Sequence, residues 1–216
     1  MCGGEAEEES KDLWNLKTAM DVTGFQTAYE SAVDKAVMIV RETAESLERD
    51  CRREILSSIS GRVKKPESIR RKLIKKKCDI TLENVAARIN DIAGIRATCY
   101  FLDDVHELAQ KLKIHPELHF LKEKNYIEKP KSSGYKSLHL IVEVPIDFQG
   151  ERRWVKAELQ LRTLAMDFWA RLDHRLCYKK DILAAKAVQK DLKEYAEIIS
   201  RVDSQMLDLR KRIDAL

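Results

Sequence analysis

The segment 155–162 constrains the fold most, because apolar and polar side chains alternate along it without a break. Its apolar positions are Val155, Ala157, Leu159 and Leu161, and its polar positions are Lys156, Glu158, Gln160 and Arg162. At the two-residue period of a strand, the apolar set faces a core and the polar set forms a row on the opposite face. A row of cation, acid, amide and cation is typical of the floor of a site for a charged ligand. An edge strand with a solvated polar face would show the same alternation.

Helical spacing dominates the first part of the chain. Residues 23–57 repeat apolar positions at the helical period and predict one long helix. Residues 57–65 contain Gly61 and are expected to form a break, after which a short helix begins at Pro66 and ends near residue 77. Thr81 is the predicted N-cap of the next helix, because a side-chain oxygen there can accept from a backbone N–H of the first turn.

The rest of the chain mixes strands with helices. The elements expected after Gly94 are a strand at 95–101, a helix at 104–112, a short strand with a turn at 118–127, a strand at 138–144 closed by Pro145, a strand at 154–162 and a helix at 164–179. This order predicts an α+β fold, in which helices flank a mixed or antiparallel sheet. Long helices are expected at both ends of the chain.

The C-terminal segment carries a heptad pattern. Apolar residues at alternating spacings of three and four are Leu192, Tyr195, Ile199, Val202, Met206, Leu209, Ile213 and Leu216. Such a seam suits another helix, which could be the long N-terminal helix or a second copy of the chain. We therefore expect three parts: an acidic and flexible tail at 1–20, a main domain at 21–180, and a helical segment at 181–216 for packing or oligomerisation.

Composition excludes several classes of protein. The 216 residues are 44% hydrophobic and 35% charged, which is typical of a soluble globular chain and not of a disordered one. No apolar run is long enough to span a membrane, and no signal-peptide pattern begins the chain, so a cytoplasmic location without membrane contact is expected. The five cysteines are irregularly spaced and form no Cys-x-x-Cys pair, which fits reduced thiols better than a disulfide scaffold or a zinc site.

Charge is unevenly distributed along the chain. Residues 62–77 hold nine basic residues against one acid, Glu67, which indicates an anionic ligand nearby. The cations of this run that could converge on a polyphosphate are Arg62, Lys64, Lys72 and Lys75. A solvated helix face would explain most of the lysines equally well.

Two carboxylates are candidates for a shared magnesium site. Asp91 lies where a helix region turns into a strand, and Glu158 lies in the polar row of a second strand. If the strands are neighbours, both acids can hold Mg²⁺, which takes one or two carboxylates together with substrate phosphates and waters. Taken singly, Asp91 also reads as a surface acid and Glu158 as a cross-strand partner of a lysine. Tyr135 could stack on a base or cap a hairpin, and His139 alone reads as a structural histidine.

Five motifs in order resemble the RelA/SpoT synthetase domain. They lie at residues 62–69, 91–96, 134–139 (Gly-Tyr-Lys-Ser-Leu-His), 158–163 and 165–170. The length and the Asp-Phe-Trp-Ala sequence at 167–170 are similar to small alarmone synthetases of the RelQ type. The resemblance covers roughly residues 20–200 and implies a nucleotidyltransferase-like synthetase fold.

The resemblance implies an enzyme that moves the β,γ-pyrophosphate of ATP to the ribose 3′-hydroxyl of GDP or GTP, making ppGpp or pppGpp. The residues implied for the ATP phosphates are Arg62, Lys64 and Lys72, with Lys75 near them. Asp91 and Glu158 are implied to hold Mg²⁺, and Glu158 also to orient or deprotonate the attacking hydroxyl. The residues implied for the acceptor nucleotide are Tyr135, Lys136, His139, Gln160 and Asp167. In this set Tyr135 would stack on guanine, and Asp167 could accept from its N1–H and N2–H groups.

The sequence departs from the family pattern at some positions, and the resemblance leaves some properties undecided. The Lys-Ser-Ser turn at 131–133 stands where the family usually has Pro-Asn, so local acceptor contacts can differ. The chain has no His-Asp dipeptide and no room for a hydrolase domain, so synthesis without hydrolysis is expected. The resemblance also implies a homotetramer and leaves regulation by single-stranded RNA open. The alternatives are a same-fold toxic synthetase that modifies tRNA 3′ ends or adenine nucleotides, and a non-catalytic RNA-binding module.

Overall fold

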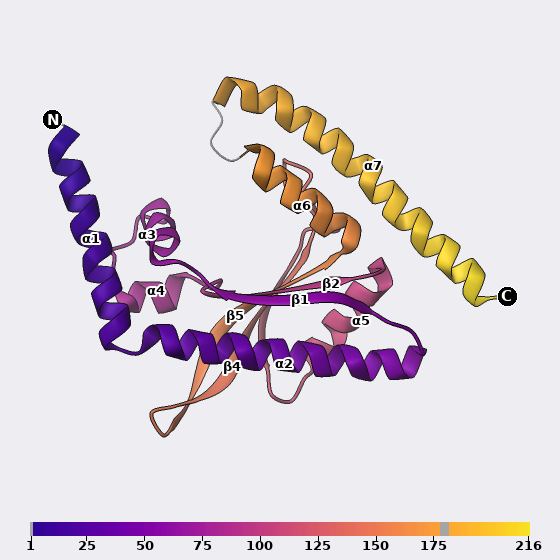
Figure 1. Ribbon diagram of the computed structural model, residues 1–216, viewed down its shortest axis with the longest axis horizontal. Helices are drawn as coiled ribbons and strands as arrows, with labels where there is room; N and C mark the ends of the chain where they lie inside the picture. The colour runs from indigo at the N-terminus through magenta and orange to yellow at the C-terminus, as the bar shows by residue number, and fades with distance from the viewer. Residues whose placement is uncertain (1, 178–181) are drawn as a thin grey trace.

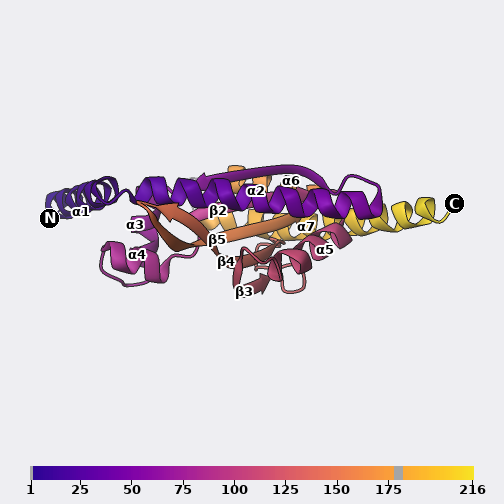
Figure 2. The same ribbon diagram turned by 90° about the horizontal axis from the view of Figure 1, so that it is seen from below.

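The computed structural model describes residues 2–177 and 182–216. The helices are α1 (Cys2–Val22), α2 (Phe25–Cys51), α3 (Pro66–Lys75), α4 (Leu82–Arg88), α5 (Leu102–Lys113), α6 (Leu164–Cys177) and α7 (Ile182–Asp214). The strands are β1 (Leu56–Val63), β2 (Ala93–Cys99), β3 (His119–Asn125), β4 (Leu138–Phe148) and β5 (Glu151–Thr163). The molecule is elongated, with its two termini at opposite ends in both views (Figures 1 and 2).

The five strands form one mixed sheet in the order β1-β2-β5-β4-β3. Strands β2 and β5 pair in parallel, and the other neighbours pair antiparallel. The prediction of an α+β fold with a mixed sheet is therefore confirmed. Strand β5, which holds the alternating segment, lies in the middle of the sheet between β2 and β4.

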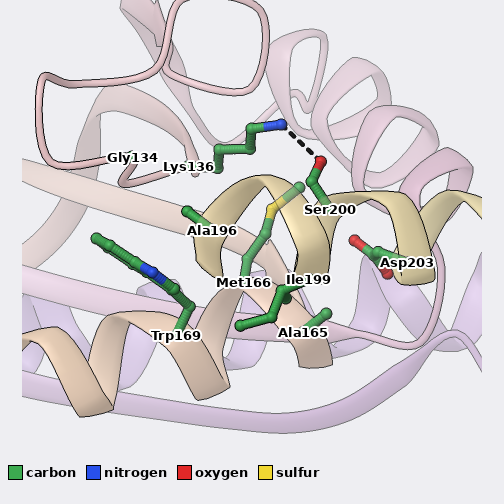
Figure 3. A pocket seen from close by; sticks show the side chains of 9 residues that line it. All are labelled: Gly134, Lys136, Ala165, Met166, Trp169, Ala196, Ile199, Ser200 and Asp203. Carbon is green, nitrogen blue, oxygen red and sulfur yellow. Dashed lines mark hydrogen bonds between the residues drawn. The ribbon is translucent and has the colours of Figure 1, made fainter. Parts of the chain in front are cut away.

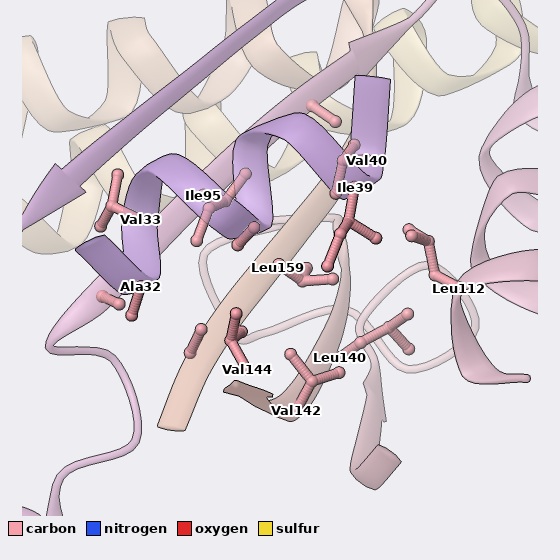
Figure 4. Close-up of a cluster of buried hydrophobic side chains, with 14 of the residues drawn as sticks. Ala32, Val33, Ile39, Val40, Ile95, Leu112, Leu140, Val142, Val144 and Leu159 are labelled. Carbon is pink, nitrogen blue, oxygen red and sulfur yellow. The ribbon is translucent and has the colours of Figure 1, made fainter. Parts of the chain in front are cut away.

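The alternation along β5 separates the core from the site. Ala157, Leu159 and Leu161 are fully buried in the main core. Helix α2 covers this face of the sheet, and its residues Ile39 and Val40 point toward Leu159 (Figure 4). Full burial of an aliphatic side chain stabilises the fold by about 1.5–3 kcal/mol. This interface therefore fixes which face of β5 points toward α2. The polar row consequently faces away from α2.

Local signals position the short helices as expected. Pro66 lies in the first turn of α3, where its missing N–H costs nothing. The Thr81 hydroxyl accepts from the backbone N–H of Asn84 at 3.2 Å and caps α4. These two signals were correctly predicted.

Two strand boundaries differ from the prediction. The segment 57–65, expected to be a break, is largely strand β1, an edge strand whose exposed residues give no clear alternation. Pro145 does not close β4, which continues to Phe148 with Pro145 opposite Trp154. Strand β3 pairs with β4 only as far as Glu143, so β4 is an edge on that side at Pro145. A proline that need not donate to a neighbour is tolerated there.

The N-terminal segment is helical where a flexible tail was expected. Helix α1 spans Cys2–Val22, and its residues Leu16 and Met20 are buried one turn apart in the main core. Lys17 also forms an ion pair with Glu67 of α3 at 2.7 Å. The acidic residues of this segment are typical of a solvated tail, whereas the buried pair Leu16 and Met20 attaches the helix to the domain.

The C-terminal segment is helical as predicted, but over the described residues helix α7 does not pack on the long N-terminal helix α2. It packs on α6 and α5, while α2 lies on the other side of the sheet in Figure 1. Within the heptad set, Leu192 is buried and Ile199 is half-buried, and the others are exposed. The last two residues of the helix predicted at 164–179, and the boundary at 180, lie outside the described residues. Within the described ranges, no helix is both long and apolar enough to cross a membrane.

Candidate active site

A large cavity of about 1180 Å³ lies on the polar face of the sheet. Its size exceeds that of a typical single-ligand pocket, which is about 300–1000 Å³. The predicted residues that line it are Arg62, Lys72, Asp91, Tyr135, His139, Glu158 and Gln160. The polar row of β5 thus forms part of a cavity floor, as the alternation predicted.

The two candidate acids lie on the same side of the sheet. Glu158 of β5 is opposite Gly94 of β2 in the parallel register, and Asp91 lies three residues before Gly94. Both carboxylates line the cavity. The charge of Asp91 acts to raise the pKa of Glu158, which is the effect of one nearby carboxylate on another.

Two lysines hold the carboxylate of Asp91. Lys64 Nζ donates to one oxygen at 2.9 Å, and Lys72 Nζ donates to the other at 2.7 Å. Burial by itself would raise the pKa of Asp91, but the hydrogen bonds from Lys72 and Lys64 outweigh it and leave the pKa below its usual value. Asp91 is therefore ionised at neutral pH. Through Lys64, which follows β1, and Lys72 of α3, it links the start of β2 to these two elements.

Glu158 is only 7% exposed and is held by an amide and an imidazole. Gln160 Nε2 donates to it at 2.8 Å, and His139 Nδ1 lies 3.4 Å from its other oxygen. Burial by itself would raise the pKa of Glu158, but the hydrogen bonds from His139 and Gln160 help to outweigh it, and the pKa lies below its usual value. Glu158 is thus a pre-ionised carboxylate in a confined site.

His139 connects Glu158 to Tyr135. The Tyr135 hydroxyl lies 2.9 Å from His139 Nε2, on the ring edge opposite the nitrogen that faces Glu158. Arg162 Nη2 donates to the same hydroxyl at 2.5 Å. A tautomer with the proton on Nδ1 satisfies both contacts, because the tyrosine then donates to Nε2 and the histidine donates to Glu158. His139 therefore orients the acid instead of being an isolated structural histidine.

The basic run contributes unevenly to the site. Arg62 and Lys72 line the cavity, and Lys64 reaches it through Asp91. Lys75, in the last turn of α3, is exposed and is not in the cavity lining. Lys72 and Lys75 are three residues apart and lie on the same side of α3, so the difference is one of reach: Lys72 extends to Asp91, and Lys75 stays in solvent in the last turn.

Tyr135 lies between cations and a second tyrosine. Lys131 Nζ is 4.7 Å from the centre of its ring, and the Arg162 guanidinium carbon is 5.0 Å from it. Lys131 Nζ is also 4.9 Å from the centre of the Tyr126 ring, and the two rings lie edge to face with centres 6.0 Å apart. Its ammonium therefore occupies one position against both rings, which we call the slot. Partial desolvation lowers the pKa of Lys131, with smaller contributions from neighbouring charges.

Asp167 lies beside the cavity, in the first turn of α6, and is held by arginines. Arg162 Nη1 donates to it at 3.2 Å, Arg171 Nε donates to it at 2.5 Å, and Arg96 Nη1 lies 3.6 Å away. Arg171 is largely exposed and comes from the next turn of the same helix, so it is the partner most easily displaced. Burial and the charge of Arg162 lower the pKa of Arg96.

Lys136 points away from the cavity. Its Nζ donates to Ser200 Oγ of α7 at 2.6 Å and lines a separate small cavity between α6 and α7 (Figure 3). Of the predicted acceptor residues, the cavity brings together Tyr135, His139 and Gln160, with Asp167 at its margin and Lys136 behind it.

Sequence reasoning missed several side chains that line the cavity. These are Arg96, Lys124, Tyr126, Lys131, Arg171 and Arg175. Lys124 and Tyr126 are two residues apart at the end of β3 and so share a side of the chain, and Arg96 faces the site from β2. The two-residue period of a strand could have identified Lys124 and Tyr126, but the sequence of segment 118–127 predicts only a short strand and turn.

Asp91 and Glu158 could hold a magnesium ion only if substrate phosphates complete its coordination shell. Among residues 2–177 and 182–216, no group of three or more histidine, cysteine or acidic side chains could hold a metal ion by itself. Two carboxylates beside phosphate-binding cations are what Mg²⁺ uses when phosphates and waters complete its shell. Asp91 and Glu158 are thus suited to Mg²⁺ in company with a polyphosphate, and not to a dedicated protein-only site.

The chain is similar to known proteins over most of its length. A family model described as a region found in RelA / SpoT proteins matches residues 61–183. The chain is similar to GTP pyrophosphokinase YwaC of Bacillus subtilis, at 45% identity over 154 residues, 71% of this chain and 73% of the relative. It is also similar to GTP pyrophosphokinase YjbM of the same organism, at 31% identity over 189 residues and 88% of each chain.

Solved structures give the same result. The crystal structure of small alarmone synthetase 1 from Bacillus subtilis bound to its product pppGpp superposes with a TM-score of 0.80 at 29% identity, covering 91% of this chain and 99% of that one. Small alarmone synthetase 2 from the same organism gives a TM-score of 0.75 at 36% identity, covering 87% and 97%. With its matching family model and its fold, the chain belongs to the RelA/SpoT family.

Proposed function

We propose that this protein is a small alarmone synthetase that transfers the β,γ-pyrophosphate of ATP to the ribose 3′-hydroxyl of GDP or GTP. The observation that carries the proposal is that Asp91 and Glu158 line one cavity, between phosphate-binding cations and the ring of Tyr135. The cavity has room for two nucleotides. The names of the relatives, both GTP pyrophosphokinases, and the pppGpp bound to one similar structure support the same reaction.

The ATP phosphates would lie against Arg62, Lys64 and Lys72. The 3′-oxygen of the acceptor attacks the β-phosphorus of ATP, the bond from that phosphorus to the bridging α,β-oxygen breaks, and AMP leaves. Positioning and neutralisation of the phosphate charge supply most of the catalysis in such a transfer. Lys75 is exposed, so its contribution would be to the electrostatic field and not a direct contact.

Asp91 and Glu158 would hold Mg²⁺, which supplies charge neutralisation on the phosphate oxygens when bound. Glu158 is ionised and aligned by His139 and Gln160, so it can orient the acceptor hydroxyl and accept its proton as the O–P bond forms. Its lowered pKa makes it a weak base, so we assign orientation as its larger contribution.

The acceptor would stack on Tyr135 after Lys131 leaves the slot, with His139 and Gln160 near the ribose. A guanine edge could take the place of Arg171 on Asp167, whose ionised carboxylate accepts hydrogen bonds and donates none. An acceptor contact by Lys136 would require its ammonium to leave Ser200.

Further parts of the proposal rest on the resemblance. We propose synthesis without alarmone hydrolysis, a cytoplasmic location, and a main domain at 21–180 with residues 181–216 serving assembly. The homotetramer rests on the resemblance. The exposed face of α7 supports self-association, because it presents a continuous apolar stripe: Tyr195, Ile198, Val202, Met206, Leu209 and Ile213. Single-stranded RNA as a regulator stays open.

The test is product analysis after incubation of the purified protein with labelled ATP and, separately, GDP, GTP, ADP and bulk tRNA. We expect label to appear in ppGpp or pppGpp. Glu158→Gln should abolish synthesis, whereas Glu151→Gln, on the exposed end of the same strand, should not. Label in tRNA or an adenine nucleotide would assign the toxic-synthetase alternative. RNA binding without any transfer, unchanged by Glu158→Gln and weakened steeply by salt, would assign the binding-module alternative.

A further inference from the structure

Helix α7 contacts the turn that carries Tyr135. Trp169 of α6 and Leu192 and Ala196 of α7 form a small buried cluster, and the Tyr135 ring packs against it. The rings of Tyr135 and Trp169 lie edge to face with centres 6.4 Å apart. The indole N–H of Trp169 also donates to the Leu192 carbonyl at 3.0 Å. The C-terminal helix is therefore in the wall behind the proposed stacking position.

The backbone of this turn touches α7 directly. Gly134 has a φ of 87°, in the region that favours glycine, and a Cβ added to it would lie 2.6 Å from the Ala196 Cβ and 3.3 Å from the Lys193 Cα. Such separations leave no room for the turn to move toward the helix. A shift of α7 would therefore move the turn, and Tyr135 with it.

A hydrogen bond fixes the same turn from its other end. Lys136 Nζ donates to Ser200 Oγ at 2.6 Å, one helical turn after Ala196 (Figure 3). Ser137, the next residue, is fully buried and donates to the Leu161 carbonyl of β5 at 3.2 Å. The turn is thus fixed between β5 on one side and α7 on the other.

A second polar contact ties α7 to the start of α6. The Thr163 hydroxyl donates to Asp203 Oδ2 at 2.7 Å and accepts from the Met166 backbone N–H at 3.2 Å. Thr163 therefore acts as a cap for the first turn of α6, and Asp203 sets the orientation of its hydroxyl. That turn carries Asp167, which shares Arg162 with Tyr135.

We propose that Ser200 and Asp203 of α7 are positioning residues for the acceptor side of the site. Ser200 acts through Lys136 on the Tyr135 turn, and Asp203 acts through Thr163 on the first turn of α6. We call these two contacts the α7 clamp. The inference rests on the proposed function and extends it, because it makes Lys136 part of the clamp and not a direct ligand of the acceptor. Within the described part of the chain, the side-chain hydrogen bonds of Ser200 and Asp203 go to Lys136 and Thr163, and not to the ATP side built from β1, α3 and Asp91.

The first test is the Michaelis constants of Ser200→Ala for GDP and for ATP. Loss of one hydrogen bond that orders the turn should raise the KM for GDP about fivefold and leave the KM for ATP within about twofold. Ser200→Thr retains a hydroxyl and should restore the GDP value. Ser204→Ala is the matched control, because Ser204 lies one turn further on, is exposed and bonds only to the Ser200 carbonyl among the contacts of the described chain.

The second test separates positioning from direct binding. If Lys136 acts through Ser200, then Lys136→Ala and the double variant Lys136→Ala with Ser200→Ala should raise the KM for GDP equally. If Lys136 binds the acceptor itself, the double variant should be worse than Ser200→Ala by a further factor. Asp203→Ala should also raise the KM for GDP, with Asp203→Asn close to wild type and exposed Asp208→Ala as its control.

The outcomes distinguish this inference from the proposed function. A wild-type protein that makes no alarmone with any acceptor overturns the proposed function, and the clamp with it. Active wild type with an unchanged KM for GDP in both alanine variants overturns the clamp alone. Equal rises in both Michaelis constants, or a loss of melting temperature that accounts for the activity loss, would also overturn it by assigning a merely structural role.

Discussion

The structure assigns separate tasks to the ring and the hydroxyl of Tyr135, and two substitutions can test this. In the proposed site the ring would stack on the acceptor base, and the hydroxyl contacts His139, which orients Glu158. Tyr135→Phe removes only the hydroxyl. This removes the hydroxyl's contacts with both His139 and Arg162. Loss of the contact that orients Glu158 through His139, worth about 1 kcal/mol, should lower kcat about fivefold, while the KM for GDP stays within about twofold. Tyr135→Ala also removes stacking worth about 1–3 kcal/mol, so the KM for GDP should rise roughly 5- to 150-fold.

Initial rates of alarmone formation at varied GDP and at varied ATP measure both effects. Tyr100→Phe is a suitable control, because the Tyr100 hydroxyl donates to Glu54 at 3.2 Å and Tyr100 is not among the described residues that line the cavity. In the Tyr135 variants the KM for ATP should not change, since the proposed phosphate-binding cations lie on other elements. The reasoning is refuted if Tyr135→Phe raises the KM for GDP as much as Tyr135→Ala does, because the hydroxyl and not the ring would then bind the acceptor.

Three stability predictions follow from buried groups. Burial raises the pKa of Asp203, and Thr163 and Lys136 offset this only in part, so the stability that the protonated carboxyl contributes is lost as pH rises through its folded pKa. The melting temperature of Asp203→Asn should therefore exceed that of wild type by more at pH 7 than near pH 4. An equal difference at the two pH values would contradict this. Arg53→Met leaves the fully buried Asp104 without its ion pair and should cost about 3 kcal/mol in urea unfolding, and a cost below about 1 kcal/mol would contradict this. Gly61→Ala places a Cβ 2.3 Å from Val33 Cγ1 and should cost about 1–3 kcal/mol in the same assay, where a neutral result would show that α2 shifts freely.

The elements with strong periodicity were predictable from the sequence. The alternation in β5, the proline at the start of α3 and the Thr81 cap each act within a few residues, so a local signal sufficed. Strand β1 could not be found this way, because an edge strand with few buried residues has little alternation. The continuation of β4 past Pro145 depends on where β3 stops, which is a fact of the assembled sheet.

In the site too, some features follow from local sequence and others from long-range contacts. Motif order selected the two acids and the aromatic residue, and these line one cavity. The sequence could not show that Lys136 turns toward α7, because its partner Ser200 is 64 residues away in the chain. Nor could it show that arginines already hold Asp167. Long-range partners decide which of several charged residues in a motif faces the ligand.

The central claim is that Asp91 and Glu158 hold one divalent cation together with the substrate phosphates. The most direct measurement is an electron paramagnetic resonance titration of Mn²⁺ into the protein with GDP and a non-hydrolysable ATP analogue. The account predicts one tight Mn²⁺ in the wild type and in Glu151→Gln, and its loss or marked weakening in both Asp91→Asn and Glu158→Gln. Undiminished tight binding in those two variants would contradict the account.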